Sequence, residues 1–148
     1  MPDNLTSFVG ASLRSVEQTD YSWFFSFGDG LAIGTESPWR LVTPDGIAVS
    51  SDDHGHQFGL PSPVDAADRV MSRLASHLVL AVSVDAKTGD LLLSFADKSH
   101  LQFLQMSCGY ESWRVTTQHG ESICLGGGKI AFLPAAKKSD PPEGMDSR

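Results

Sequence analysis

The sequence predicts an α+β fold, in which one central helix packs on a strongly twisted antiparallel sheet or partial barrel. Two segments of similar pattern, about 8–50 and 78–125, contain short runs of β-branched and aromatic residues separated by turns. A stretch between them, about 63–76, has apolar residues at helical spacing. The chain has 148 residues, of which 41% are apolar, so we expect a single globular domain over residues 1–136.

The two segments align as an internal repeat. A shift of 68 positions places Phe24-Phe25-Ser26-Phe27 on Leu92-Leu93-Ser94-Phe95, and a shift of 74 places Trp39-Arg40 on Trp113-Arg114. The difference implies a six-residue insertion in the second copy, between about 98 and 110. We therefore predict two related β-meanders with a pseudo-two-fold axis, and convergence of two unrelated meanders is the alternative.

Most of the predicted strands lie within the repeat, and we expect a sheet of about eight to ten strands. Turn residues such as Pro44-Asp45-Gly46 separate them. The ranges that read as strands are 8–17, 21–27, 31–34, 39–43, 47–50, 78–85, 90–95, 100–106, 112–117, 123–125 and 129–133.

The predicted helix begins with the capping sequence Ser62-Pro63-x-Asp65. We expect its apolar stripe to lie on one face of the sheet. Residues 137–148 are rich in Pro, Ser and charge, which predicts a disordered tail. The stripe consists of Val64, Ala67, Val70, Met71 and Leu74.

The net charge of −7 argues against direct nucleic-acid binding, which depends on Lys and Arg at phosphates. No apolar run has the length of a membrane span, and the N-terminus lacks the pattern of a secretion signal. We therefore expect a cytoplasmic protein without membrane contact. In that compartment Cys108 and Cys124 are expected as reduced thiols, with a bridge between them as the alternative.

Potential metal ligands are densest in Asp52-Asp53-His54-Gly55-His56. His54 and His56 would face the same side of an extended strand, and Asp53 could add an oxygen ligand. A metal site needs three or four ligands, and this spacing supplies only two or three. The other interpretations are a polar loop leading to the helix and a binding loop without metal. We predict no cofactor.

Other candidate motifs do not indicate catalysis. Gly126-Gly127-Gly128-Lys129 lacks the spacing of a phosphate-binding loop and precedes a predicted strand, so it predicts a tight turn or bulge. Cys108 has no local signature of a nucleophile. Trp39 and Trp113, each followed by Arg, predict core aromatics with an outward Arg, or alternatively a solvent-facing anchor for a protein partner.

Several segments in this order resemble a family of uncharacterised small bacterial proteins, similar to proteins encoded near secreted toxins, where immunity proteins occur. The resemblance covers most of residues 20–130 and implies a small α+β fold, with no catalytic residue to carry over. Its motifs are Pro38-Trp39-Arg40, Asp53-His54-Gly55-x-x-Phe58-Gly59, Pro63-x-Asp65-Ala66, Thr88-Gly89-Asp90-Leu91, Tyr110-Glu111-Ser112-Trp113 and Gly126-Gly127-Gly128.

The leading hypothesis is a non-enzymatic binding protein, an immunity-type inhibitor of a bacterial toxin. An acidic surface can imitate phosphate and steer the protein toward a basic nuclease site. One alternative is a small-molecule-binding or metal-dependent enzyme that uses loop 52–56, and another is an oligomerisation module that uses an exposed sheet edge. The candidate contacts for a protein partner, possibly a toxin domain, are Asp52, Asp53, His54, Tyr110 and Glu111.

Overall fold

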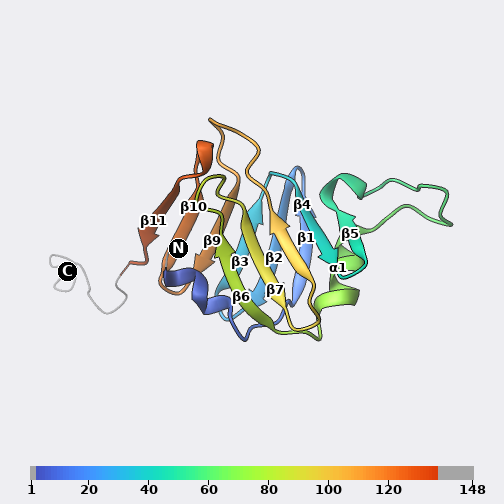
Figure 1. Cartoon of the computed structure of the whole chain (residues 1–148), viewed down its shortest axis with the longest axis horizontal. Helices are drawn as coiled ribbons and strands as arrows, with labels where there is room; N and C mark the ends of the chain where they lie inside the picture. Colours follow the sequence, from blue (N-terminus) through green and yellow to red (C-terminus); the bar gives the residue numbers. More distant parts are fainter. Residues whose placement is uncertain (1–2, 137–148) are drawn as a thin grey trace, which may run out of the picture.

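A computed structural model describes residues 3–136, which form two antiparallel sheets packed face to face (Figure 1). Sheet 1 has the strand order β1-β2-β3-β9-β10-β11, and sheet 2 has the order β5-β4-β8-β7-β6. The strands of sheet 1 are β1 (Ser15–Thr19), β2 (Ser22–Gly28), β3 (Leu31–Thr35), β9 (Trp113–Thr117), β10 (Gly120–Cys124) and β11 (Ile130–Pro134). Those of sheet 2 are β4 (Trp39–Thr43), β5 (Gly46–Ser50), β6 (Val79–Val84), β7 (Leu91–Phe95) and β8 (His100–Phe103).

This architecture confirms the predicted antiparallel strands and single helix, but it corrects the prediction of one curled sheet or partial barrel. The described chain is mostly β with one α-helix, and its strands are divided between two sheets that do not close into a barrel. The packing of one sheet on the other follows from strand composition, because buried and outward side chains alternate along strands such as β3 and β9. Each sheet therefore has one apolar face, and the two faces bury each other.

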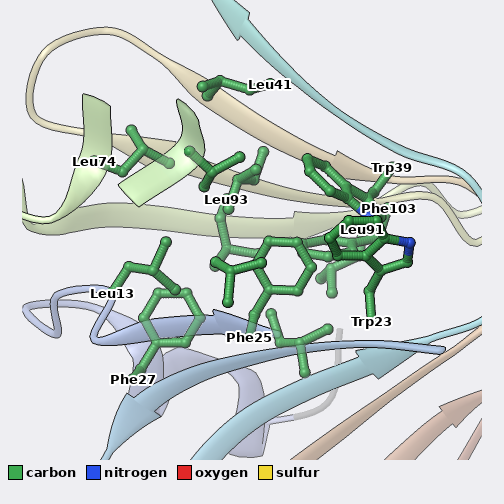
Figure 2. Close-up of a cluster of buried hydrophobic side chains, with 14 of the residues drawn as sticks. Leu13, Trp23, Phe25, Phe27, Trp39, Leu41, Leu74, Leu91, Leu93 and Phe103 are labelled. Carbon is green, nitrogen blue, oxygen red and sulfur yellow. The ribbon is translucent and has the colours of Figure 1, made fainter. Parts of the chain in front are cut away.

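The core between the sheets is rich in aromatic side chains. Figure 2 shows Trp23 and Phe25 pointing from sheet 1 toward Trp39 and Phe103 of sheet 2. The Phe25 ring meets Trp39 and Phe103 edge to face, at centroid distances of 5.1 and 4.9 Å. Trp23 meets Trp39 in the same way at 5.1 Å. Edge-to-face pairs of this kind fix the two sheets relative to each other.

The two halves of the chain exchange strands between the sheets. β1–β3 form a meander in sheet 1, after which β4 and β5 cross to sheet 2; β6–β8 form a meander in sheet 2, after which β9 and β10 cross to sheet 1. The order β1-β2-β3-β9-β10 in sheet 1 thus matches β6-β7-β8-β4-β5 in sheet 2. A duplicated meander with a pseudo-two-fold axis would produce this arrangement, and descent by duplication stays a prediction.

The pairing registers of the two sheets also match. In sheet 1, Phe24, Gly34 and Arg114 are neighbours across three adjacent strands. In sheet 2 the corresponding neighbours are Leu92, Gln102 and Arg40. These correspondences follow the same two shifts, 68 and 74, that align the sequence.

The helix α1 spans Ala66–Leu74 and is shorter than the predicted 63–76. Its N-cap is Asp65, not Ser62, and the Asp65 carboxylate accepts the Asp68 N–H at 3.1 Å. The reason lies before the cap, where backbone hydrogen bonds of Val64 with His56 and with Gly55 close a loop. Val64 is therefore held outside the helix.

Two short elements close the open sides of the sandwich. α1 contacts β1 and β5, so its buried residues cover the edges of both sheets rather than one sheet face. On the other side, the 3-10 helix η1 (Asp3–Phe8) contacts β6, β9 and β10. In the described range no helix is long and apolar enough to cross a membrane. The predicted disordered tail, 137–148, lies outside the described residues.

The triple glycine is a turn, as predicted. It forms the short 3-10 element η3 (Gly126–Gly128) between β10 and β11, and Gly127 and Gly128 have φ of 82° and 99°. A Cβ on Gly128 would lie 2.5 Å from the Thr88 carbonyl oxygen, and one on Gly126 would lie 2.5 Å from Gly109. Glycine is therefore required here by close backbone approach, not by a phosphate.

Candidate interaction site

The loop after β5 uses its polar residues to hold its own shape. This segment contains the 3-10 element η2 (Ser51–Asp53). The Asp53 carboxylate accepts the Ser50 N–H at 2.9 Å, and the Ser50 hydroxyl accepts the Asp52 N–H at 3.2 Å. These two bonds form a reciprocal capping box. The role of Asp53 seen here is therefore structural.

His54 is also engaged within the fold. Its Nδ1 accepts the Ala66 N–H at 3.0 Å, at the start of α1, and its ring meets the edge of Trp23 at 5.1 Å. The exposed His56 stacks on Phe58 at 5.6 Å. Among residues 3–136, no group of three or more His, Cys, Asp or Glu could hold a metal ion. Asp53, His54 and His56 thus do not converge as a metal-ligand set.

Tyr110 and Glu111 lie in the long loop between β8 and β9. With Glu36 and Ser37 they line a shallow hollow of about 490 Å³. Gln105 fixes the loop, because its Nε2 donates to the carbonyl oxygens of Tyr110 at 2.9 Å and Leu125 at 2.8 Å. Both Tyr110 and Glu111 are exposed, so the loop presents them to solvent in a fixed position.

The predicted contact residues therefore fall into two groups. Tyr110 and Glu111 belong to the hollow beside Glu36. Asp52, Asp53 and His54 belong to the β5–α1 connection, and no hydrogen bond or ion pair that the structure describes joins them to the first group.

The first group continues into a pocket on the outer face of sheet 1. The pocket has a volume of about 220 Å³ and includes Phe24, Glu36, Glu111 and Arg114. The Arg114 guanidinium lies 3.8 Å from the Glu111 carboxylate and 3.4 Å from the Glu121 carboxylate. Arg114 is thus held between two carboxylates at the centre of this face.

Glycine makes room for an aromatic ring on this face. Phe24 is 49% exposed, and its ring would be only 3.4 Å from a Cβ on the neighbouring Gly34. Ser22 donates to the Glu36 carboxylate at 3.4 Å and so orients it toward the same pocket. Gly34 and Ser22 have small side chains, so they leave the Phe24 ring and the Glu36 carboxylate accessible.

We call this surface the acidic face of sheet 1. Its carboxylates are those of Glu17, Glu36, Glu111 and Glu121, and its cations include Arg114 and, beside β11, Lys129. Glu17 is the cross-strand neighbour of Phe24, so it lies on the same side of the sheet. With four carboxylates against the cations of Arg114 and Lys129, this set of residues has a negative net charge.

Sequence reasoning predicted Tyr110 and Glu111 here but did not select Phe24, Glu36 or Arg114. A signal was present, because alternation along β2 and β9 places Phe24 and Arg114 opposite the buried Trp23 and Trp113. Convergence of these strands depends on the β3–β9 pairing, which the repeat pattern alone does not specify.

The matching Arg of sheet 2 has a different environment. Arg40 Nε donates to Gln102 Oε1 at 2.7 Å, in a pocket of about 310 Å³ that Leu92 and Leu104 also line. Trp39 and Trp113 are fully buried, so the core interpretation of both Trp-Arg pairs is confirmed. Only Arg114 is held between carboxylates, so the two outer faces have different chemistry.

Ionisable groups with shifted pKa values occur at structural positions. Backbone N–H groups of Thr88 and Lys87 lower the pKa of Asp85. Burial raises the pKa of the Cys124 thiol. Cys108 and Cys124 are both free thiols, so the alternative of a bridge between them is not realised.

A family model described as a family of unknown function (DUF6188) matches residues 5–134. The chain belongs to this family. No curated protein and no solved structure matches it. The DUF6188 match agrees with the resemblance to an uncharacterised family and covers both sheets and α1. The acidic face of sheet 1 lies entirely within the DUF6188 region.

Proposed function

We propose that this protein is a non-enzymatic binding protein, an immunity-type inhibitor that uses the acidic face of sheet 1 to cover the basic active site of a bacterial toxin. The observation that carries the proposal is the arrangement of carboxylates around Phe24 and Arg114. Nuclease sites bind phosphates with Lys and Arg, and a set of carboxylates on a fixed surface can satisfy those cations instead.

The aromatic side chains supply the rest of the interface. Tyr110 is 81% exposed beside Glu111, and Phe24 is half exposed beside Arg114. Tyr and Arg are enriched among residues that dominate protein–protein binding energy. The backbone hydrogen bonds of the sheet already hold this surface in place, so it loses little conformational entropy when a partner binds. Affinity is therefore expected from the aromatic groups, and the association rate from the carboxylates.

The experiment co-expresses the protein with the toxin domain encoded beside its gene and measures cell survival and complex formation. The wild-type protein should protect cells and co-purify with the toxin domain. Glu111→Lys should weaken the complex by about tenfold or more, since it places a cation opposite cations. Binding should also weaken as salt rises.

The matched control is Asp45→Lys, which makes the same charge change on an exposed residue of the β4–β5 turn in sheet 2. This variant should protect as well as wild type. The proposal is wrong if co-expression gives neither protection nor a complex, or if both variants behave alike.

A further inference from the structure

Four strand edges border the two sheets, and three of them are covered. α1 packs against β1 and β5. The edge of β6 is paired with the segment after η1, because Gly10 N–H donates to Val79 O at 2.8 Å and Val79 N–H donates to Ala11 O at 2.9 Å. The edge of β11 has no such cover among residues 3–136. Figure 1 shows β11 at the side of the molecule opposite α1.

The free backbone groups of β11 follow from its pairing with β10. Leu125 N–H donates to Lys129 O at 2.7 Å, and Ala135 N–H donates to His119 O at 3.0 Å. Odd-numbered residues of β11 therefore bond to β10, and even-numbered residues turn their N–H and C=O groups outward. Ile130 and Phe132 thus present donors and acceptors at the edge. Pro134, which has no N–H, also falls on an outward position, where a strand tolerates proline.

β11 also lacks the usual protection of an edge strand. Its sequence is Ile-Ala-Phe-Leu-Pro, without charge, and Phe132 and Leu133 are 43% and 52% exposed. Natural edges are commonly guarded by charged side chains, bulges or a covering element. β11 has no counterpart in the matching strand order of sheet 2, so it extends sheet 1 beyond the shared plan.

We propose that β11 pairs antiparallel with β11 of a second copy of this chain and joins the two six-stranded sheets into one. A two-fold axis at Ala131 places Ile130 opposite Phe132 of the partner copy. In this register every outward N–H and C=O group of Ile130 and Phe132 is paired, and Pro134 stays outside. Antiparallel pairing about a two-fold axis is self-complementary, which suits a second identical chain.

Charge complementarity favours the same occupant. In this register Lys129 lies opposite Leu133 of the partner copy, and Leu133 is itself the neighbour of Glu121 on β10. The ammonium group and the carboxylate therefore lie in one row on the outer face, with backbones two strand spacings or about 10 Å apart, a distance that a Lys and a Glu side chain can span together. By symmetry the dimer contains two such pairs, each with Lys129 from one copy and Glu121 from the other. The paired strands bring no like charges together.

The first test is the molar mass of the full chain in solution, measured by size-exclusion chromatography with light scattering. Wild type should have twice the chain mass at micromolar concentration. Phe132→Pro removes an N–H that points away from β10, so it should give a monomer that keeps the β-sheet circular dichroism spectrum of the wild type. Phe132→Lys gives the same readout if proline disturbs the strand. The matched control is Ile47→Lys, which adds a charge at another exposed apolar position, on the edge strand β5, and should stay dimeric.

A second test locates the axis. Across a non-hydrogen-bonded antiparallel pair, Cα atoms lie about 4.5 Å apart, which permits a disulfide. In a Cys108→Ser background, Ala131→Cys should form a covalent dimer on mild oxidation, and Glu121→Cys should not. A monomeric wild type, or a dimer that Phe132→Pro and Phe132→Lys leave intact, would overturn the proposal. Loss of the dimer without loss of toxin protection would separate this inference from the proposed function.

Discussion

Trp39 and Trp113 occupy matching positions in the two sheets but differ by one hydrogen bond. Trp113 Nε1 donates to the Gly89 carbonyl oxygen at 2.8 Å. Trp39 is equally buried, and its Nε1 has no acceptor among the described residues. A buried donor without a partner costs about 1–3 kcal/mol. The pair therefore separates the packing contribution of an indole from its hydrogen-bond contribution.

We expect Trp113→Phe to destabilise the protein by about 1–2 kcal/mol more than Trp39→Phe. Both changes remove similar volume from the core. Only Trp113→Phe also removes a hydrogen bond, and it leaves the Gly89 carbonyl oxygen without the indole N–H. Urea unfolding followed by circular dichroism measures both free energies. Equal losses in the two variants would contradict this account.

Single residues also show what sequence patterns can predict. The burial of Trp39 and Trp113 and the outward direction of the following Arg were predicted from local pattern alone. The role of His54 was not, because its partner Ala66 is twelve residues away and only the folded loop brings the two together. Roles that depend on a tertiary hydrogen bond leave no periodic signal.

At the scale of elements, Asp97 ties α1 to the β7–β8 turn. Its carboxylate accepts Arg73 Nε at 2.7 Å, the Ser99 hydroxyl at 2.8 Å and the Ser99 N–H at 3.0 Å. Burial opposes ionisation of Asp97, but the hydrogen bonds from Arg73 and Ser99 outweigh it and hold its pKa below the ordinary 3.8. The charged carboxylate is therefore the form that stabilises the fold.

This shift predicts a dependence of stability on pH. Because the folded pKa is lowered, the contribution of Asp97 is fully present above about pH 5 and is lost as pH falls from there through the folded pKa. Asp97→Asn should lower the unfolding free energy by about 1–2 kcal/mol at pH 7 and by less near pH 3. Urea midpoints at several pH values measure the difference.

Asp45→Asn is the control, since that exposed side chain makes no hydrogen bond or ion pair with the described residues. A constant gap between Asp97→Asn and wild type from pH 7 to pH 3 would show that the ionised carboxylate is not the cause.

The boundaries of elements were predictable where alternation sets them and less so where a tertiary contact does. Most strands lie close to their predicted ranges, since buried and outward positions alternate. The helix start was misplaced by three residues because Ser62 and Asp65 both fit a capping pattern. The hydrogen bonds between Val64 and the loop at His56 decide between them, and no local rule includes those bonds.

At the scale of the whole molecule, the strand exchange makes each half depend on the other. β4 and β5 join sheet 2 only through the pairing of β4 with β8, and β9, β10 and β11 join sheet 1 only through the pairing of β9 with β3. We expect fragments 1–60 and 61–148 to be unfolded when separate and to form a β-sheet signal when mixed. Far-UV circular dichroism of each fragment and of the mixture measures this. A fragment 1–60 that folds alone would contradict the dependence.

The strands are divided between two sheets, and the sequence patterns do not specify this division. The sequence therefore predicted one curled sheet. Repeat and alternation determine how many strands each half supplies, but not which sheet each strand joins. That choice is made by cross-strand contacts such as Phe25 with Trp39, which bring residues of opposite sheets together. The acidic face depends on the same choice, because Glu36, Glu111 and Phe24 share one surface only when β9 pairs with β3.

The same exchange has a consequence for biosynthesis. The Thr35 hydroxyl at the end of β3 donates to the carbonyl oxygen of Ser112, across 77 residues of sequence. While the chain leaves the ribosome, the first meander is complete long before its neighbour β9 exists, and the edge of β3 stays open. During translation there is therefore an interval in which the unpaired backbone groups at the edge of β3 are exposed to other molecules in the cell. Folding to the final state begins only after most of the polypeptide has been made, which favours slow, post-translational folding.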